Sequence, residues 1–522
     1  MKSFIARYGS LITGVLHGFD RLVFMGSLRS LVYAPRMMVY LSRVGLLIKD
    51  FTRWTQDLGS QIKDAAARAT RDAGRPLCYL KSSATSKEDL VREIARRDGV
   101  RDGLIAVLSC VEPCRSFDVR SDRAAKKIEL INRPRQCLHL YYYYMHPTFG
   151  FMHVRLQTWA PYTVRVSING REWLARQMDQ AGIGYVRRDN CFPWIEDVPA
   201  AQALMQQQLD VRWNTVLDEF VQQVNPIHRP HFQDYGLDYY WSVYQSEWAS
   251  DVMFRDATDL ARLYPRWLRH GMETFGSGDV MRFLGRRVPA DGHVNPRFGG
   301  EVVSDLKRRP EGVRIKHRVD ANSIKLYDKQ GSVLRAETTI NHPKDFKVYR
   351  RKAGQTGGAP GWHPLRKSVA DIARRAEVSQ KANERYLEAL AAVDDSRSLR
   401  ELAEPLCRPA RWKRQRVRAL NPLSPDDAAL LAAVSRGEFA INGLRNRDLC
   451  GILYANVAPD AAEQRRRSSA VTRKLRLLRA HGLIHKVPHT HRYTVSPQGR
   501  LAISALLAAR EASAQELTKH AA

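Results

Sequence analysis

The sequence lacks any long hydrophobic run, and this absence limits what the protein can be. No stretch approaches the ~20 apolar residues that a membrane-spanning helix requires. The N-terminus also lacks a secretory signal, since Lys2, Arg7, His17 and Asp20 interrupt its apolar character. We therefore expect a cytoplasmic protein with no membrane partner.

Cysteine is scarce as well. Seven cysteines are scattered over 522 residues, and an odd number at such spacing fits reduced thiols better than a disulfide framework. Cys110 and Cys114 are followed by Cys137, His139 and His146, so a zinc site is conceivable. A second tight ligand pair is missing, and buried thiols at the end of a strand are the favoured interpretation.

Acidic residues are the third deficit. Asp and Glu total 54 against 84 Lys and Arg, which leaves a formal net charge of +30. A surface with this excess of positive charge attracts polyanions. DNA, RNA or both are therefore the expected partners, and a chain of this length has room for about three or four domains.

The last hundred residues predict a winged helix. Ser424, Pro425 and Asp427 have the N-cap and first-turn pattern of a helix, and Asp460 with Glu463 predicts a capping box for a later helix. The expected elements are a helix ended by Gly437, a strand at Phe439 to Ile441, a helix at Leu444 to Tyr454, a helix running to Ala480, and a wing hairpin made of Leu483 to Val487 and Arg492 to Ser496.

The third of these helices has two distinct faces. Val471, Leu475 and Leu478 form one buried stripe at helical spacing. A neighbouring face is expected to contact phosphates and bases, and it consists of Arg465, Ser469, Thr472, Arg476 and Arg479. The run from Ala470 to Leu483, AVTRKLRLLRAHGL, resembles the recognition helix of bacterial winged-helix regulators of the MarR and ArsR kind, which implies DNA recognition. Winged helices also serve as protein-interaction modules, so that alternative stays open.

The whole chain predicts an α+β multidomain fold, with a sheet-containing basic body ahead of the winged helix. A strand is expected around Leu11 to Leu28, and the glycine-rich stretch from Lys352 to Trp362 is the expected linker. The expected divisions are an N-terminal α/β region at 1–103, a β-hairpin-rich domain at 104–200, a helical region with a β-hairpin at 201–351, the linker at 352–362, a helical connector at 363–420 and the winged helix at 421–522.

The segment CLHLYYYYMHPTFGFMHVRLQTW predicts a β-hairpin. A turn centred on Thr148 places Tyr143 opposite His153 and Tyr141 opposite Arg155. If these four side chains share an exposed face, they suit single-stranded nucleic acid, because rings stack on bases and cationic groups meet phosphates. The alternative is a sheet face covered by a helix, in which the tyrosines fill space.

A second hairpin is predicted in SIKLYDKQGSVLRAETTI. A turn centred on Gly331 pairs Lys325 with Glu337 and Tyr327 with Arg335 on one face. The bottom-up interpretation of Lys325 and Glu337 is a cross-strand ion pair.

The residues Tyr327 to Lys329, with Arg335 and Glu337, resemble a strand pair of plasmid rolling-circle replication initiators. That resemblance implies DNA nicking through a tyrosine, with a divalent metal held by histidines. Those enzymes commonly carry two histidines around one apolar residue, whereas this chain has His139-Leu140-Tyr141.

Carboxylates offer another route to phosphodiester cleavage. The candidates are Asp20 in GFDRLVFMG, Asp251 in SEWASDVMF, Asp328 and Glu337. A divalent metal, with Mg²⁺ as the candidate cofactor, needs two or more of them to converge. Structural ion pairs are the alternative for each one.

The chain as a whole resembles an uncharacterised bacterial protein family, a likeness that implies one multidomain unit and no particular activity. The matching stretches are Gly18 to Gly26, Cys110 to Cys114, Asn169 to Trp173, Arg314 to His317, Tyr327 to Lys329 and His481 to Ile484. The first functional hypothesis is a mobile-element or replication-type protein that recognises DNA and cleaves a strand as a metal-dependent nuclease or transposase-like enzyme. The second is a non-enzymatic winged-helix regulator or an RNA-binding ribonucleoprotein component.

Overall fold

The protein was analysed as a computed structural model, which describes residues 1–513 apart from 123, 125–126, 287–299, 310–311, 352–358, 392–397, 437–438, 440–442, 455 and 489. The chain divides into two compact units, each discontinuous in sequence. We call His17–Trp248 with Lys367–Ala373 the hairpin unit. The terminal unit combines Met1–Leu16, Ala249–Arg366 and Arg374–Ala522.

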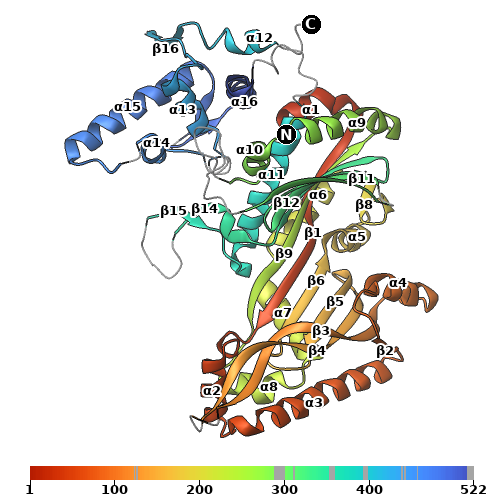
Figure 1. The fold of residues 1–522 in the computed structure, drawn as a ribbon. Helices are drawn as coiled ribbons and strands as arrows, with labels where there is room; N and C mark the ends of the chain where they lie inside the picture. Colours follow the sequence, from red (N-terminus) through yellow and green to blue (C-terminus); the bar gives the residue numbers. More distant parts are fainter. Residues whose placement is uncertain are drawn as a thin grey trace. The chain divides into compact units, whose positions relative to one another are not determined.

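The structure is mixed α/β, as expected for the α+β class, and its largest element is an eleven-stranded sheet. The strand order is β10-β11-β12-β13-β9-β1-β6-β5-β4-β3-β2, with β2 and β3 parallel and β3 to β6 successively antiparallel. Figure 1 shows β1 in red next to β9 in the middle of this order. The strands are β1 (Ile12–Ser27), β2 (Leu77–Leu80), β3 (Gly103–Asp122), β4 (Lys127–His146), β5 (Gly150–Gln157), β6 (Val164–Asn169), β9 (Tyr240–Phe254), β10 (Val302–Arg309), β11 (Gly312–Val319), β12 (Asn322–Lys329) and β13 (Val333–Ile340).

The hairpin unit contains most of the long strands. Its other elements are α2 (Ala34–Arg43), α3 (Phe51–Asp72), α4 (Lys87–Arg97), α5 (Gly170–Ala181), β7 (Tyr185–Arg188), β8 (Cys191–Ile195), α6 (Val198–Gln206), α7 (Trp213–Val224) and α8 (His228–His231). Asn169 caps α5 by accepting hydrogen bonds from the backbone of Arg171 and Glu172. Position 170 requires glycine, because a Cβ there would lie 1.7 Å from the carbonyl oxygen of Phe19. This close approach holds α5 against β1 next to Asp20.

The terminal unit buries one face of β11 to β13 under helices. Ile315, Ile324 and Leu334 pack in a single core with Trp267 and Tyr386. By strand alternation, residues such as Lys325 and Glu337 lie on the opposite face. The remaining elements of this part are α1 (Lys2–Tyr8), α9 (Ala257–Glu273), α10 (Ser277–Phe283), β14 (Lys347–Arg350), β15 (Gly361–Pro364) and α11 (Ile372–Ala391), whose first two residues belong to the hairpin unit.

The C-terminal part of the terminal unit has its own core, which includes the predicted stripe Val471, Leu475 and Leu478. Ser424 and Asp460 cap their helices by accepting hydrogen bonds from the backbone three residues on, as predicted, whereas the Glu463 side chain of the expected capping box pairs with Arg466 and Arg467. The elements are α12 (Leu399–Ala403), β16 (Ala410–Trp412), β17 (Gln415–Val417), α13 (Pro425–Val434), α14 (Asn446–Leu453), α15 (Ala461–Ala480), β18 (Ile484–Lys486), β19 (Tyr493–Val495) and α16 (Pro497–Glu511).

Three sequence expectations differ from this arrangement or fall outside it. The region at 201–351, expected to be helical with a β-hairpin, also contains the long strand β9. The expected linker lies at 352–358 outside the described residues, and its end at Gly361 and Trp362 belongs to β15, which pairs with β14. The expected strand at 439–441 is mostly outside the described residues, and α16 was not anticipated.

Candidate metal centre

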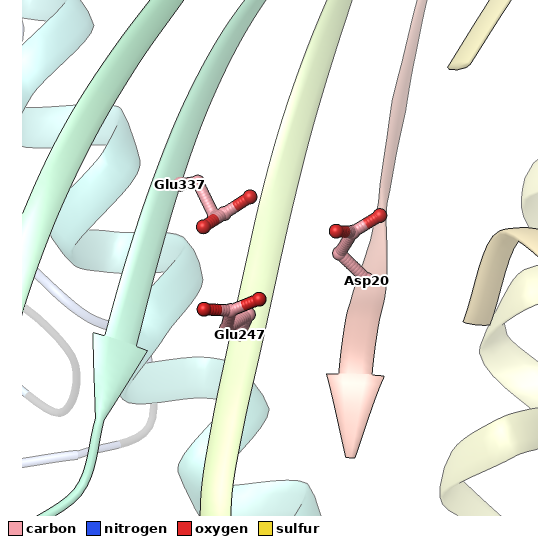
Figure 2. Close-up of side chains that lie close together, drawn as sticks. All are labelled: Asp20, Glu247 and Glu337. Carbon is pink, nitrogen blue, oxygen red and sulfur yellow. The ribbon is translucent and has the colours of Figure 1, made fainter. Parts of the chain in front are cut away.

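Three carboxylates from distant parts of the sequence meet on adjacent strands of the large sheet. Asp20 lies on β1, Glu247 on β9 and Glu337 on β13, and these strands are neighbours in the order β13-β9-β1. One oxygen of each carboxylate lies within 4.8 Å of the other two. Figure 2 shows the three side chains turned toward one another. We call this group the acidic triad.

The acidic triad has the chemistry of a divalent cation site. Asp20 and Glu337 are buried and Glu247 is half-buried, so water screens their mutual repulsion poorly. Carboxylate oxygens are the ligands that hard cations such as Mg²⁺ and Ca²⁺ prefer. A bound cation would offset the repulsion, and the triad could therefore hold a metal ion.

Polar neighbours orient each of the three carboxylates. The Asn190 side-chain amide, in the turn between β7 and β8, donates to both oxygens of Asp20 at 3.3 and 3.1 Å. The Lys325 ammonium donates to Glu337 Oε1 at 2.6 Å. Arg21 Nε lies 3.8 Å from Glu247 Oε2.

Two of the three carboxylates in the acidic triad are among the acids predicted from the sequence. Asp20 and Glu337 were both candidates, and the structure brings them together. Glu247 was missed, although SEWASDVMF places it four residues before the candidate Asp251, hence on the same side of an extended strand. A second acid at that spacing from Asp251 was the available signal.

The other two predicted catalytic acids lie outside the acidic triad. Both oxygens of Asp251 accept hydrogen bonds from the buried guanidinium of Arg335, at 2.6 and 2.8 Å. Asp328 has even parity on β12, so it is directed to the opposite face from Lys325. Burial raises the pKa of Asp328 above its ordinary value, while a hydrogen bond from the Gly331 backbone opposes that rise. Of the four predicted acids, Asp20 and Glu337 therefore converge, and Asp251 and Asp328 are not part of the same group.

The aromatic hairpin has the predicted register but not the predicted exposure. Tyr143 pairs with His153 and Tyr141 with Arg155 across β4 and β5, as expected. However, Tyr141 and Tyr143 are only 7% and 3% exposed, in a core cluster with Val91 and Ile94 of α4. The expected open stacking face is thus corrected to a sheet face that a helix covers.

The basic side chains of this hairpin are also unsuited to phosphate binding. Arg155 Nη2 and the Tyr141 hydroxyl donate to Glu112 at 3.0 and 2.7 Å, and Lys87 pairs with the same carboxylate. Burial, with the charges of Arg21 and Arg155, lowers the pKa of His153 to about 3. His153 is therefore neutral near pH 7 and cannot serve as a cation for phosphates.

The predicted contact face of α15 is mostly open to solvent. Arg465, Ser469, Thr472 and Arg476 are exposed. Arg479 is half-buried, and its guanidinium lies over the ring of Trp412, 4.7 Å from the centroid. The first four side chains are open to solvent, although Thr472 accepts a hydrogen bond from Asn446 and Arg476 donates one to Gln415, whereas Arg479 also takes part in packing.

No helix in the described residues is long and apolar enough to cross a membrane. Comparisons with protein-family models, with curated proteins and with solved structures found no match.

Proposed function

We propose that the protein is a nucleic-acid-binding enzyme that cleaves phosphodiester bonds with a divalent metal, Mg²⁺ being the first candidate, at Asp20, Glu247 and Glu337. The observation that carries the proposal is the convergence of three largely buried carboxylates within 4.8 Å. Burying like charges together is costly, and a bound cation would add to the compensation that Asn190, Lys325 and Arg21 provide.

The substrate class follows from charge. The formal net charge of +30 favours a polyanionic partner such as a nucleic acid. The phosphodiester bonds of that partner are the bonds that a metal at the acidic triad would help to cleave. A bound Mg²⁺ would act as a Lewis acid on the phosphate and on the attacking water. Hydrolysis joins the oxygen of water to phosphorus and breaks one P–O ester bond, which leaves a phosphate on one strand end and a hydroxyl on the other.

Recognition of DNA is assigned to residues 421–522, as a winged helix. Two features support this part of the proposal: the succession of α13, α14 and α15 followed by the antiparallel pair β18 and β19, and the exposed basic side chains of α15. A DNA-reading domain joined to a cleaving body fits a mobile-element or replication-type protein.

A nicking assay tests the proposal. Purified protein is incubated with supercoiled plasmid and Mg²⁺ or Mn²⁺, with EDTA as the negative control. We expect Asp20→Asn and Glu337→Gln to abolish nicking while DNA binding persists, because the exposed basic side chains of α15 are separate from the metal ligands. Asp328→Asn is the matched control, because that acid lies outside the acidic triad.

Two results would contradict the proposal. Nicking that survives both triad variants would place the chemistry elsewhere. DNA or RNA binding without metal-dependent cleavage by the wild-type protein would favour the second function, a non-enzymatic winged-helix regulator or a ribonucleoprotein component, for which the exposed basic face of α15 is the supporting observation.

A further inference from the structure

Two lysines stand directly opposite each other on the strands that follow the acidic triad across the sheet. Lys316 of β11 is in register with Lys325 of β12, and Lys325 is in register with Glu337 of β13. Directly opposed residues project from the same face of a sheet. The three side chains therefore form a row that leads away from the metal centre.

Like charges directly opposite each other destabilise a sheet unless something compensates for them. The Lys325 ammonium has a partner in Glu337 Oε1 at 2.6 Å. Lys316 has no such partner: within the part of the chain that the structure describes, its ammonium makes no ion pair and no hydrogen bond.

The carboxylate directly opposite Lys316 on the neighbouring strand already forms ion pairs with two other basic side chains. Asp305 of β10 stands opposite Lys316, but it pairs with Arg314 at 3.3 Å and with Lys307 at 3.7 Å. Burial lowers the pKa of Lys316, and the charges of Lys325 and Arg314 lower it further, with Asp305 opposing them. This position therefore holds excess positive charge that an anion would neutralise.

The anion must approach from the polar face. Ile315, Ile324 and Ala336 point to the other face and pack into the core of the terminal unit. Lys316 is half-buried, so part of its side chain is open to solvent. A lysine ammonium offers three donors and a compact charge, which suits phosphate oxygens.

We infer that Lys316 and Lys325 form a phosphate-binding site that holds the substrate strand beside the metal centre; this inference rests on the proposed function. Adjacent strands lie about 4.8 Å apart, so Lys316 stands about two strand spacings from Glu337. That separation suits a phosphate next to the one at the metal. The lysine pair positions the strand, and the acidic triad holds the reacting group.

The test uses the full-length protein and a fluorescein-labelled single-stranded DNA oligonucleotide. Binding is measured by anisotropy with Ca²⁺ in place of Mg²⁺, and cleavage is measured with Mg²⁺. We expect Lys316→Met to raise KM and Kd about tenfold and to leave kcat within about twofold, because a ground-state phosphate contact is lost. The slope of log Kd against log salt concentration should also fall by about 0.7, which is the contribution of one phosphate contact with a single strand.

Two further variants separate this role from a structural one. Lys316→Met removes a like-charge contact, so its melting temperature without ligand should equal or exceed that of the wild type. Lys316→Arg should restore most of the affinity, since it keeps the charge. Lys307→Met is the matched control, because Lys307 is on the neighbouring strand β10, is 52% exposed and already pairs with Asp305.

The outcomes distinguish the lysine site from the cleavage proposal. If Lys316→Met keeps the wild-type KM and salt dependence while Asp20→Asn abolishes cleavage, the phosphate site is overturned and the proposed function stands. If no cleavage occurs with any metal but Lys316→Met still weakens oligonucleotide binding, the proposed cleavage is overturned and the lysine pair stands as a binding site.

Discussion

Asp251 and Arg335 form a buried two-point ion pair, in which Arg335 Nε and Nη2 donate to the two oxygens of Asp251 at 2.6 and 2.8 Å. Both side chains are at most 2% exposed. The pair links β9 to β13, and Asp251 lies outside the acidic triad.

Loss of this pair should lower stability. Asp251→Asn leaves the Arg335 charge without its counter-ion, and breaking such a buried pair costs about 3–5 kcal/mol of the free energy of unfolding. Urea unfolding measures the change. The control Asp259→Asn, at a surface pair with Arg262, should cost under about 1 kcal/mol. Lost nicking with unchanged unfolding would instead make Asp251 a ligand.

Tyr143 should contribute to stability and not to strand binding. Its ring is packed beneath α4, so Tyr143→Ala leaves a cavity and is expected to cost about 3–5 kcal/mol. Tyr79→Ala, at a ring that is 60% exposed, is the matched control and should have a small effect. Thermal melting and affinity for single-stranded DNA are measured on the same variants. Weaker binding at an unchanged melting temperature would show that Tyr143 contributes to binding and not to stability.

Glu112 should make stability depend on pH in the acid range. Burial alone would raise its pKa, but hydrogen bonds from Tyr141 and Lys87 and the charge of Arg155 bring it down from 4.5 to about 2. A lowered folded-state pKa stabilises the fold above pH 4.5, and this contribution is lost as the pH falls toward 2. The deficit of Glu112→Gln relative to the wild type should therefore be full at pH 7 and shrink below pH 4.5.

Urea unfolding at a series of pH values measures that deficit. Glu88→Gln, at the exposed pair with Arg92, is the control and should change little. A Glu112→Gln deficit that stays constant from pH 7 to pH 3 would mean that packing, not ionisation, accounts for the contribution of Glu112.

The exposed arginines of α15 should contribute to DNA affinity through phosphates or bases. Arg465→Ala and Arg476→Ala are each expected to weaken duplex binding and, for a phosphate contact, to reduce the salt dependence by about 0.9 in log–log slope. A base contact would instead cost about 1–3 kcal/mol at one base position. Arg400→Ala, on α12 and 85% exposed, serves as the control. Equal affinities for all three variants and the wild type would favour a protein-interaction role for this helix.

Cys114 and Cys137 should be the first thiols to join on oxidation. Their sulfur atoms lie 2.8 Å apart across β3 and β4, and both cysteines are free. Treatment with a small-molecule disulfide should yield one intramolecular bond between them, detected by peptide mass spectrometry, with release of the reduced reagent thiols. Cys407, which is exposed, provides the comparison. Preferential formation of a mixed disulfide at Cys407 with no bond between Cys114 and Cys137 would contradict this expectation.

Local patterns in the sequence determined much of this structure. The registers of both hairpins, Tyr143 with His153 and Lys325 with Glu337, follow from turn position and two-residue alternation, which act over a few residues. The caps at Ser424 and Asp460 are equally local, because each side chain bonds the backbone three residues on.

Only the tertiary structure decided which residues meet. Asp20 and Glu337 were recognisable as strand-borne acids, but their approach to Glu247 depends on β1, β9 and β13 becoming neighbours although they are far apart in sequence. The packing of α4 on Tyr141 and Tyr143 also depends on contacts between residues that are far apart in sequence. The same is true of the ion pair between Arg335 and Asp251. Periodicity specifies which side of a strand a residue takes, whereas the partner on that side is set by the burial of apolar surface over the whole sheet.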